Sequence, residues 1–517
     1  MTTATANRRK TAGLLRSTGV VSSMTLLSRV FGFIRDMVLA QVFGAGFSMD
    51  AFLVAFPIPN FMRRLFAEGA FSQAFVPVLA DCSEQKAFTF VRHMLGCLGS
   101  VLLLVILLGE LASPYIISVF SPGFLDEPDR FNLATQLLRV TFPYLFFISL
   151  TALFGAVLNT YGRFAIPAFT PVLLNLIMIG AALGFADHFA APIFALAWGV
   201  FLAGFIQLLF QLPFILRLGF SICPQVNWQD PAVRRVLKLM VPVLFGVSVA
   251  QIGLLLDTLF ASFLPVGSIS WLYYSERISS LPLGIFGVAI ATVVLPHLSR
   301  KFSDQNESAY SGALDWGLRT ILLFAIPSML GLLVLGQGIL TALFQYQQFS
   351  PQDVVMASKS LRAFSLGIPG FMLVKVLAAG FYSRQNVKTP VKCAVVALVV
   401  NVLAMLILIQ YLAHMGLALA TAISATLNAT LLLGLLLKYK IYQPRSGWLL
   451  YSSRLLAANL ALFLVLWWGN GSSQQWLAWS WKLRVTHLGF LLFAGVFAYF
   501  FCLHLTGFRL RELRYRE

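Results

Sequence analysis

Long apolar runs recur along the whole chain and are separated by short polar connections. A helix that crosses the hydrocarbon core of a bilayer needs about 20 mostly apolar residues. Fourteen segments satisfy this requirement: 17–37, 46–62, 91–113, 136–158, 166–187, 191–215, 239–262, 268–291, 319–343, 360–382, 390–412, 415–437, 451–470 and 485–506. Pro57 and Pro59 interrupt the second, because proline breaks the hydrogen bonding of a helix interior. The pattern predicts an all-α polytopic membrane protein with 14 transmembrane helices.

The composition of the 517-residue chain favours the same class, since 59% of the residues are hydrophobic and only 11% are charged. Ordinary soluble domains are about 45–50% apolar and about 25% charged. Disordered chains are poor in apolar residues, so disorder is excluded as well. The strands of a transmembrane β-barrel alternate apolar with polar residues and give a much weaker hydropathy signal.

The net charge of +18 comes from 37 Lys and Arg against 19 Asp and Glu, which would also suit a nucleic-acid-binding protein. With the N-terminus inside and the 14 helices alternating, 27 of the basic residues fall in inside segments and 6 in outside segments. Four lie within helices: Arg29, Arg35, Arg277 and Lys375. Cytoplasmic loops carry such an excess of Lys and Arg, so both termini are expected to be cytoplasmic and no nucleic-acid partner is needed.

A weak internal repeat divides the chain. Pro167 and Pro390 end two similar helix connections, and Pro77 and Pro296 lie in similar apolar stretches, with a period near 220 residues in both cases. Chance matching of Pro and Phe in apolar sequence is the alternative. A repeat of six helices gives two lobes of equal membrane orientation, related by a pseudo-two-fold axis along the membrane normal. We expect a cytoplasmic leader, an N-lobe, a C-lobe, and two extra helices with a basic tail, at 1–16, 17–217, 218–440 and 441–517.

Charged residues inside the apolar segments are the candidate functional groups, because each costs about 2.5–3.5 kcal/mol at the bilayer centre on insertion scales. Arg29 and Arg35 lie in the first helix, in the stretch SRVFGFIRD. Arg35 has two alternatives to a cavity role, an ion pair with the adjacent Asp36 or with Asp50. Arg29 lies deeper in the apolar run with no acid within a turn, which favours a cavity role.

Two further arginines lie within or directly after a predicted membrane span. Arg63 follows the break at Pro57 and Pro59, and broken helices often line transporter sites; ordinary snorkelling to the interface is the alternative. Arg277 lies in the eighth helix beside Glu276, and a local ion pair between these two is its alternative. Several arginines around one cavity would bind an anion, because the guanidinium fork matches phosphate oxygens. A phosphate or pyrophosphate on a lipid is the expected ligand.

Motifs of catalysis are missing from the sequence, which contains no H-E-x-x-H, no Walker A loop and no G-x-S-x-G. The five cysteines form no C-x-x-C pair, so no metal site or disulfide framework is indicated. We therefore expect a transporter without a cofactor or metal. Its energy would come from the membrane potential, from the gradient of an ion that the sequence does not identify, or from consumption of the product.

Several motifs closely resemble the MurJ (MviN) family: VSSMTLLSRVFGFIRD, FAEGAFSQAFVP, NTYGRFAIP, SWLYYSERI and FYSRQNVKTP. The resemblance implies a flippase for lipid II, the undecaprenyl-pyrophosphate-linked peptidoglycan precursor, in the bacterial inner membrane. It also implies membership of the multidrug/oligosaccharidyl-lipid/polysaccharide (MOP) exporter superfamily, with two six-helix lobes around a central cavity and a lipid groove formed by helices 13 and 14. The partners it implies are lipid II, membrane lipids and other cell-wall synthesis proteins.

The resemblance also assigns roles to single residues. The cavity arginines of the family match Arg29, Arg35, Arg63 and Arg277, which would bind the pyrophosphate and head group. Supporting or gating roles fall on a second set: Asp36, Asp50, Glu68, Ser270 and Glu276. Pro57 stands where the family pattern has a lysine, so a role of that lysine is not expected in this chain. The expected mechanism is alternating access, with the two lobes rocking to release the head group outside.

Three other functions compete with this hypothesis. A flippase for another polyprenyl-linked glycan or a drug–ion antiporter of the same superfamily is the nearest, but a drug exporter should show cavity acids rather than arginines. A membrane glycosyltransferase would need a catalytic acid or metal pair, and the cluster of Asp126, Glu127 and Asp129 resembles a solvated turn. A structural scaffold leaves the intramembrane arginines unexplained.

Overall fold

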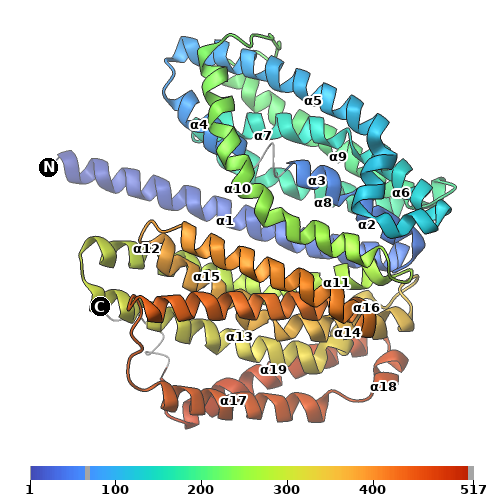
Figure 1. Ribbon diagram of the computed structural model, residues 1–517, viewed down its shortest axis with the longest axis vertical. Coiled ribbons are helices and arrows are strands. Elements are labelled where there is room, and N and C mark those ends of the chain that lie inside the picture. Colours follow the sequence, from blue (N-terminus) through green and yellow to red (C-terminus); the bar gives the residue numbers. More distant parts are fainter. Residues whose placement is uncertain (1, 64–69, 510–517) are drawn as a thin grey trace. The chain divides into compact units, whose positions relative to one another are not determined.

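The computed structural model describes residues 2–63 and 70–509, and within these residues every regular element is a helix (Figure 1). The chain forms two compact units, Met1–Gly267 and Ser268–Glu517. The helices of the first unit are α1 (Thr2–Phe43), α2 (Phe47–Ala55), α3 (Pro57–Arg63), α4 (Ala70–Ala80), α5 (Glu84–Phe120), the 3-10 turn η2 (Pro122–Asp126), α6 (Pro128–Thr141), α7 (Tyr144–Thr160), α8 (Ala165–Gly184), the 3-10 turn η3 (Ala186–His188), α9 (Phe194–Arg217) and α10 (Pro231–Ala261).

The second unit contains the remaining helices. Its elements are α11 (Ser268–Pro282), the π-helical turn η4 (Leu283–Gly287), α12 (Val288–Ser303), α13 (Glu307–Phe344), α14 (Pro351–Leu366), α15 (Ile368–Tyr382), α16 (Lys388–Lys438), α17 (Trp448–Gly469), α18 (Ser473–Ala478) and α19 (Trp481–Leu505). The all-α architecture expected from the apolar runs is therefore confirmed.

Ten helical segments of the described residues are long and apolar enough to cross a membrane. One of them, α16, contains two of the predicted spans, 390–412 and 415–437, and Ala413 interrupts it between these spans with a φ of 48° and a ψ of −131°. The three predicted spans outside the ten segments coincide with α1, with α2 and α3 together, and with α10. Each predicted span is thus helical over most of its length. The count of 14 membrane crossings stays a prediction.

The predicted break in the second span is present. α2 ends at Ala55, Phe56 forms a turn, and Pro57 begins α3. Proline suits the first position of a helix, since the N–H it lacks would have no intrahelical acceptor there. The break therefore turns one apolar run into two short helices, and the second of them carries Arg63 at its end.

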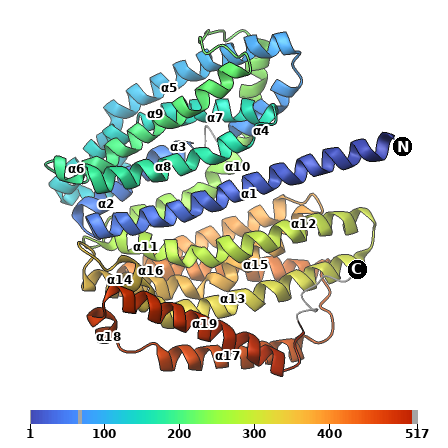
Figure 2. The same cartoon turned by 180° about the vertical axis from the view of Figure 1, so that it is seen from behind.

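In the first unit, α1 runs alongside α8, which also packs against α9 (Figure 2). α10 packs against α4 and α5, which is why the first compact unit extends to Gly267 and includes the helix that we predicted to open the C-lobe. The predicted lobe boundary at 217/218 follows the repeat rather than the packing, and the repeat symmetry stays a prediction.

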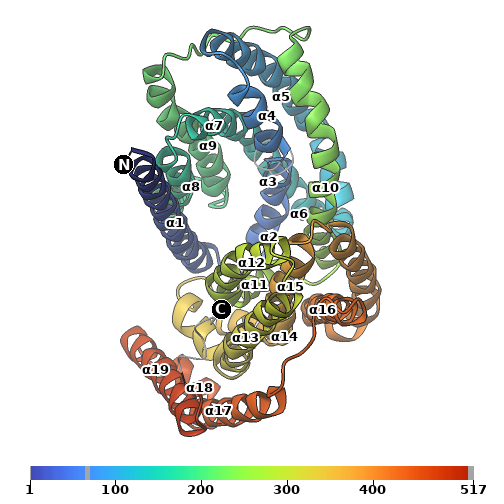
Figure 3. The ribbon, with the colours of Figure 1, turned by 90° about the vertical axis from the view of Figure 1, so that its left-hand side faces the viewer.

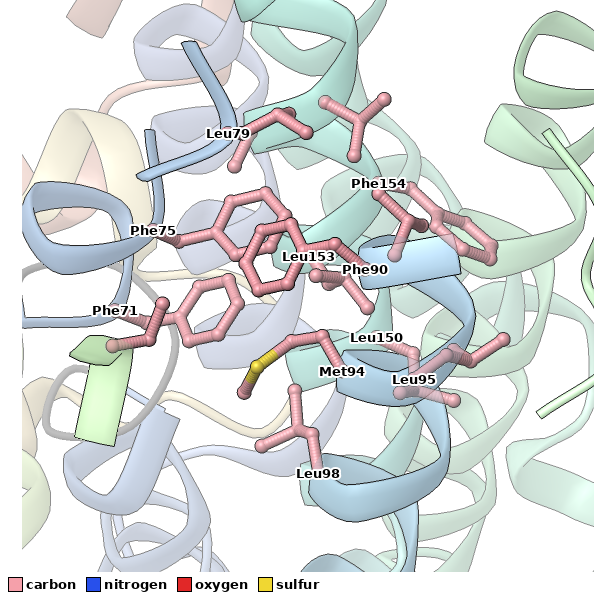
Figure 4. Packing of buried hydrophobic residues seen from close by; sticks show 14 of the residues in the cluster. Phe71, Phe75, Leu79, Phe90, Met94, Leu95, Leu98, Leu150, Leu153 and Phe154 are labelled. Atoms are coloured by element: carbon pink, nitrogen blue, oxygen red, sulfur yellow. The ribbon is translucent and has the colours of Figure 1, made fainter. Parts of the chain in front are cut away.

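An aromatic core joins α4, α5 and α7 in this unit (Figure 4). Phe75 stacks on Phe71 and on Phe90, with ring centroids 5.0 and 5.2 Å apart. Leu153 and Phe154 of α7 belong to the same cluster. Each aromatic pair contributes about 0.5–1.5 kcal/mol beyond the area that it buries. Such packing matters in a membrane, because lipid tails are as apolar as the helices and no hydrophobic force drives helices together.

In the second unit, α17, α18 and α19 lie against α13 (Figure 3). The loop before α17 is fastened to α13 by the carboxylate of Asp315. Its Oδ1 accepts hydrogen bonds from the Tyr442 hydroxyl and from Trp448 Nε1, both at 2.7 Å, and its Oδ2 lies 2.8 Å from Arg319 Nε. One buried side chain therefore fixes where the α17–α19 hairpin joins the rest of the unit.

Candidate functional site

The first helix carries Arg29 and Arg35 in different surroundings. Arg29 is exposed, whereas Arg35 is only 8% exposed and Asp36 only 3%. They are six residues apart, so about 9 Å separates them along the helix axis. The same helix thus presents one arginine at the surface and buries the other.

All three guanidinium nitrogens of Arg35 have an acceptor. Nε and Nη2 donate to Asp36 Oδ1 at 3.0 and 2.6 Å, and Nη1 donates to Asn175 Oδ1 of α8 at 3.1 Å. The ion pair with Asp36 is the first of the two alternatives to a cavity role of Arg35. The surroundings of Arg35 therefore suit a role in fixing α1 against α8.

Asp50, in the first turn of α2, is fully buried and joins two distant segments. Its Oδ2 accepts hydrogen bonds from Arg130 Nη2 at 2.6 Å and from the backbone N–H of Gly267 at 2.7 Å. Arg130 is also fully buried, and its Cζ lies 4.1 Å from the centroid of the Phe124 ring. Gly267 has a φ of +96°, which glycine adopts without strain. Asp50 therefore holds the last residue of the first unit to α2 and α6.

Arg63 is half-buried at the end of α3, where its Nε donates to Asn60 Oδ1 at 3.3 Å. Asn60 in turn donates to the carbonyl of Phe56, the residue at the break between α2 and α3. The side chain of Arg63 is thus oriented by the broken segment itself. The predicted supporting residue Glu68 lies outside the described residues.

The candidates of the second unit lie on α11. Arg277 and Glu276 are both exposed, and the Arg277 guanidinium lies over the Tyr273 ring, 4.7 Å from its centroid. Ser270 is fully buried near the start of the same helix. Trp271 beside it donates from Nε1 to Asp353 Oδ1 of α14 at 2.8 Å. The start of α11 is therefore anchored in the unit, while Arg277 stands at the surface on a ring that favours a cation.

Three polar residues important for this arrangement escaped the sequence analysis. Arg130 falls in a predicted outside segment, and its burial depends on Asp50, which is 80 residues away in sequence. Arg484 also falls in a predicted outside segment, yet it is 6% exposed and donates to four backbone carbonyls at the ends of α13 and α18. Asn175 did leave a signal, since it is a lone amide in the apolar run PVLLNLIMIG.

Among the described residues, no group of three or more His, Cys, Asp or Glu side chains is placed to hold a metal ion. The chemistry that the candidate residues offer is that of cations. Arg29, Arg63 and Arg277 present guanidinium groups on apolar helices, and such groups bind phosphate oxygens with paired hydrogen bonds. Each of these side chains is chemically suited to bind an anion.

Two solved structures have similar folds. One is described as "Lipid II flippase MurJ, inward closed conformation"; it is 26% identical, covers 94% of this chain and 98% of its own, and has a TM-score of 0.80. The other is an inward-facing multidrug resistance MATE family transporter of the MOP superfamily, which is 15% identical, covers 82% and 97%, and has a TM-score of 0.62. The second shows the fold alone. The chain thus has the fold of a multi-pass helical membrane transporter.

The family follows from the sequence comparisons. The sequence model described as "Lipid II flippase MurJ" matches residues 39–486. The "Probable lipid II flippase MurJ" of Vibrio cholerae serotype O1 is 46% identical over 512 residues, which are 97% of this chain and 98% of the relative. The chain belongs to the MurJ family.

Proposed function

We propose that this protein is a lipid II flippase, which moves the polyprenyl-pyrophosphate-linked peptidoglycan precursor from the inner to the outer leaflet of the bacterial inner membrane. The observation that carries the proposal is the 46% identity to a relative of that name over nearly the full length of both chains. Exposed arginines on apolar helices supply the matching chemistry, because they offer paired donors to a pyrophosphate. Lipid II and the surrounding membrane lipids are the proposed partners, together with other cell-wall synthesis proteins.

Within this function we propose two classes of arginine. Arg29, Arg63 and Arg277 contact the pyrophosphate and head group. Arg35 supports them by holding α1, since Asp36 and Asn175 accept hydrogen bonds from all three of its nitrogens. A variant that removes a contact arginine should therefore lose substrate affinity directly.

Supporting and gating residues act through the backbone. We propose a gating role for Asp50, whose carboxylate holds both the backbone N–H of Gly267 and the buried guanidinium of Arg130. Ser270 and Glu276, at the start and in the middle of α11, are proposed to support Arg277 on the same helix. Glu68 stays a proposed supporting residue on the strength of its sequence motif.

The mechanism that we propose is alternating access without a cofactor. An inside-negative potential of 100 mV is worth about 2.3 kcal/mol for each charge that crosses completely, so it favours export of an anionic head group. A coupled ion is a second source of energy. The 27 inside charges against 6 outside support a cytoplasmic location of both termini.

The test is an accessibility assay for lipid II in the outer leaflet of cells depleted of their own flippase. Expression of this protein should restore access of an external lipid II-specific probe and should restore growth. A parallel assay with another polyprenyl-linked glycan should show no gain. Restored access of the other glycan alone would favour the related glycan flippase instead.

A further inference from the structure

Asn175 is a buried amide in the middle of the apolar helix α8, at 6% exposure. Its two polar atoms both bind α1. Nδ2 donates to the backbone carbonyl of Ser28 at 3.1 Å, and Oδ1 accepts from Arg35 Nη1 at 3.1 Å. A single side chain of α8 therefore contacts two places on α1, one on each side of Gly32.

We propose that Asn175 is a positioning residue for head-group binding, which holds the Ser28–Arg35 stretch of α1 in place and thereby the backbone that carries Arg29. The inference rests on the proposed function of Arg29 and adds a residue that has no contact role of its own. Ser28 directly precedes Arg29, so a bond to the Ser28 carbonyl restrains the peptide unit between these two residues.

The geometry of α1 explains how one amide reaches both partners. A helical carbonyl points toward the C-terminus, and long side chains point back toward the N-terminus, so the Ser28 carbonyl and the Arg35 guanidinium converge. Gly32 lies where they meet, and a Cβ at this position would be 3.5 Å from Asn175 Nδ2. The carboxamide thus packs at contact distance on the glycine surface.

The electrostatics make this contact more important than an ordinary interhelical hydrogen bond. Arg35 and Asp36 form a buried ion pair that shares one carboxylate oxygen, Asp36 Oδ1, at 2.6 Å from Arg35 Nη2. A buried cation needs acceptors for its other donors, and Asn175 supplies one of them to Nη1. Loss of the amide would therefore remove the hydrogen bond that restrains the Ser28 carbonyl and the acceptor that binds Arg35 Nη1.

The consequence for transport is a reduced fraction of molecules with α1 in the binding position. Apparent affinity falls in proportion to that fraction, even where the contact residue is unchanged. Asn175 makes two interhelical hydrogen bonds, and both stabilise this position of α1. We expect Asn175→Ala to weaken lipid II affinity by about tenfold.

The experiment is a double-mutant cycle on the affinity for lipid II with a shortened polyprenyl chain, titrated into purified full-length protein in nanodiscs. Asn175→Ala and Arg29→Ala are measured singly and together. Asn175→Leu is a second variant, because it keeps the volume over Gly32 and loses only the hydrogen bonds. The matched control is Thr170→Val, which removes a buried polar contact of α8 that faces Gln211 of α9.

If Asn175 positions Arg29, Asn175→Ala should weaken lipid II affinity about tenfold in the wild-type background. The same substitution should have almost no effect beside Arg29→Ala, because the effects of coupled residues do not add. Asn175→Leu should behave like Asn175→Ala, and Thr170→Val should bind like the wild type. An equal loss in both backgrounds, or no loss in either, overturns the positioning role. If Arg29→Ala itself binds as tightly as the wild type, the proposed head-group role of Arg29 fails instead.

Discussion

The buried ion pair of Asp50 and Arg130 gives the sharpest stability prediction. Both side chains are fully buried, the donor and acceptor are 2.6 Å apart, and Asp50 also accepts the Gly267 N–H. Arg130→Met would leave the Asp50 carboxylate buried without this cation. Breaking a buried pair by removal of one partner costs about 3–5 kcal/mol. We expect the free energy of unfolding to fall by that amount.

A second ion pair in the same unit is the matched control. Arg235 and Asp81 lie 3.0 Å apart, but their side chains are 57% and 60% exposed. Exposed pairs contribute about 0–1 kcal/mol, so Arg235→Met should be close to the wild type although it removes the same charge. The double variant Asp50→Asn with Arg130→Met should be more stable than Arg130→Met alone, because it removes the carboxylate that Arg130→Met leaves without its cation.

Unfolding of the purified protein in detergent, followed by tryptophan fluorescence, measures these differences. The reasoning would be refuted if Arg130→Met and Arg235→Met unfolded with the same free energy. It would also be refuted if neutralising Asp50 in the Arg130→Met background brought no recovery, since the penalty would then not come from the unpaired carboxylate.

Two further predictions concern the loops. Asp315→Asn should loosen the loop before α17, because the hydrogen bonds of Tyr442 and Trp448 lose their charged acceptor. Limited proteolysis between α16 and α17 should become faster, and cleavage at the wild-type rate would contradict this role of Asp315. Burial raises the pKa of Asp230, but hydrogen bonds from His93 and from two backbone N–H groups outweigh it, so the pKa is lowered in the folded protein. The contribution of the ionised Asp230 to the free energy of unfolding is complete above the unfolded pKa of about 3.9 and is lost as the pH falls through the folded pKa. Asp230→Asn should therefore lower the free energy of unfolding by about 1 kcal/mol at neutral pH and by less in acid. A destabilisation that grew in acid would contradict this reasoning.

The membrane helices could be predicted from sequence because their signal is local. Apolar runs of the right length define the helices, and the prolines at 57 and 59 predict the break between α2 and α3. The interruption of α16 could be predicted as well, because the predicted spans 390–412 and 415–437 are separated at Ala413, where the backbone is not helical.

The candidate site divides in the same way. A charge in an apolar run is visible in sequence, so Arg29, Arg35 and Arg277 could be selected. Whether such a charge is exposed or buried depends on partners that lie far away in the chain. Asn175 is 140 residues from Arg35, and no periodicity or spacing connects them. The same limit hid the partner of Asp50.

The most direct test of the central claim is lipid II transport by Arg29→Ala and Arg277→Ala in cells depleted of their own flippase. The matched control is Arg300→Ala, a basic residue exposed in the last turn of α12. All three variants should reach the membrane in normal amounts. The account predicts that the control exposes lipid II to an external probe as the wild type does, whereas the other two do not. If both Arg29→Ala and Arg277→Ala restored exposure and growth, the claim that these arginines bind the head group would be contradicted.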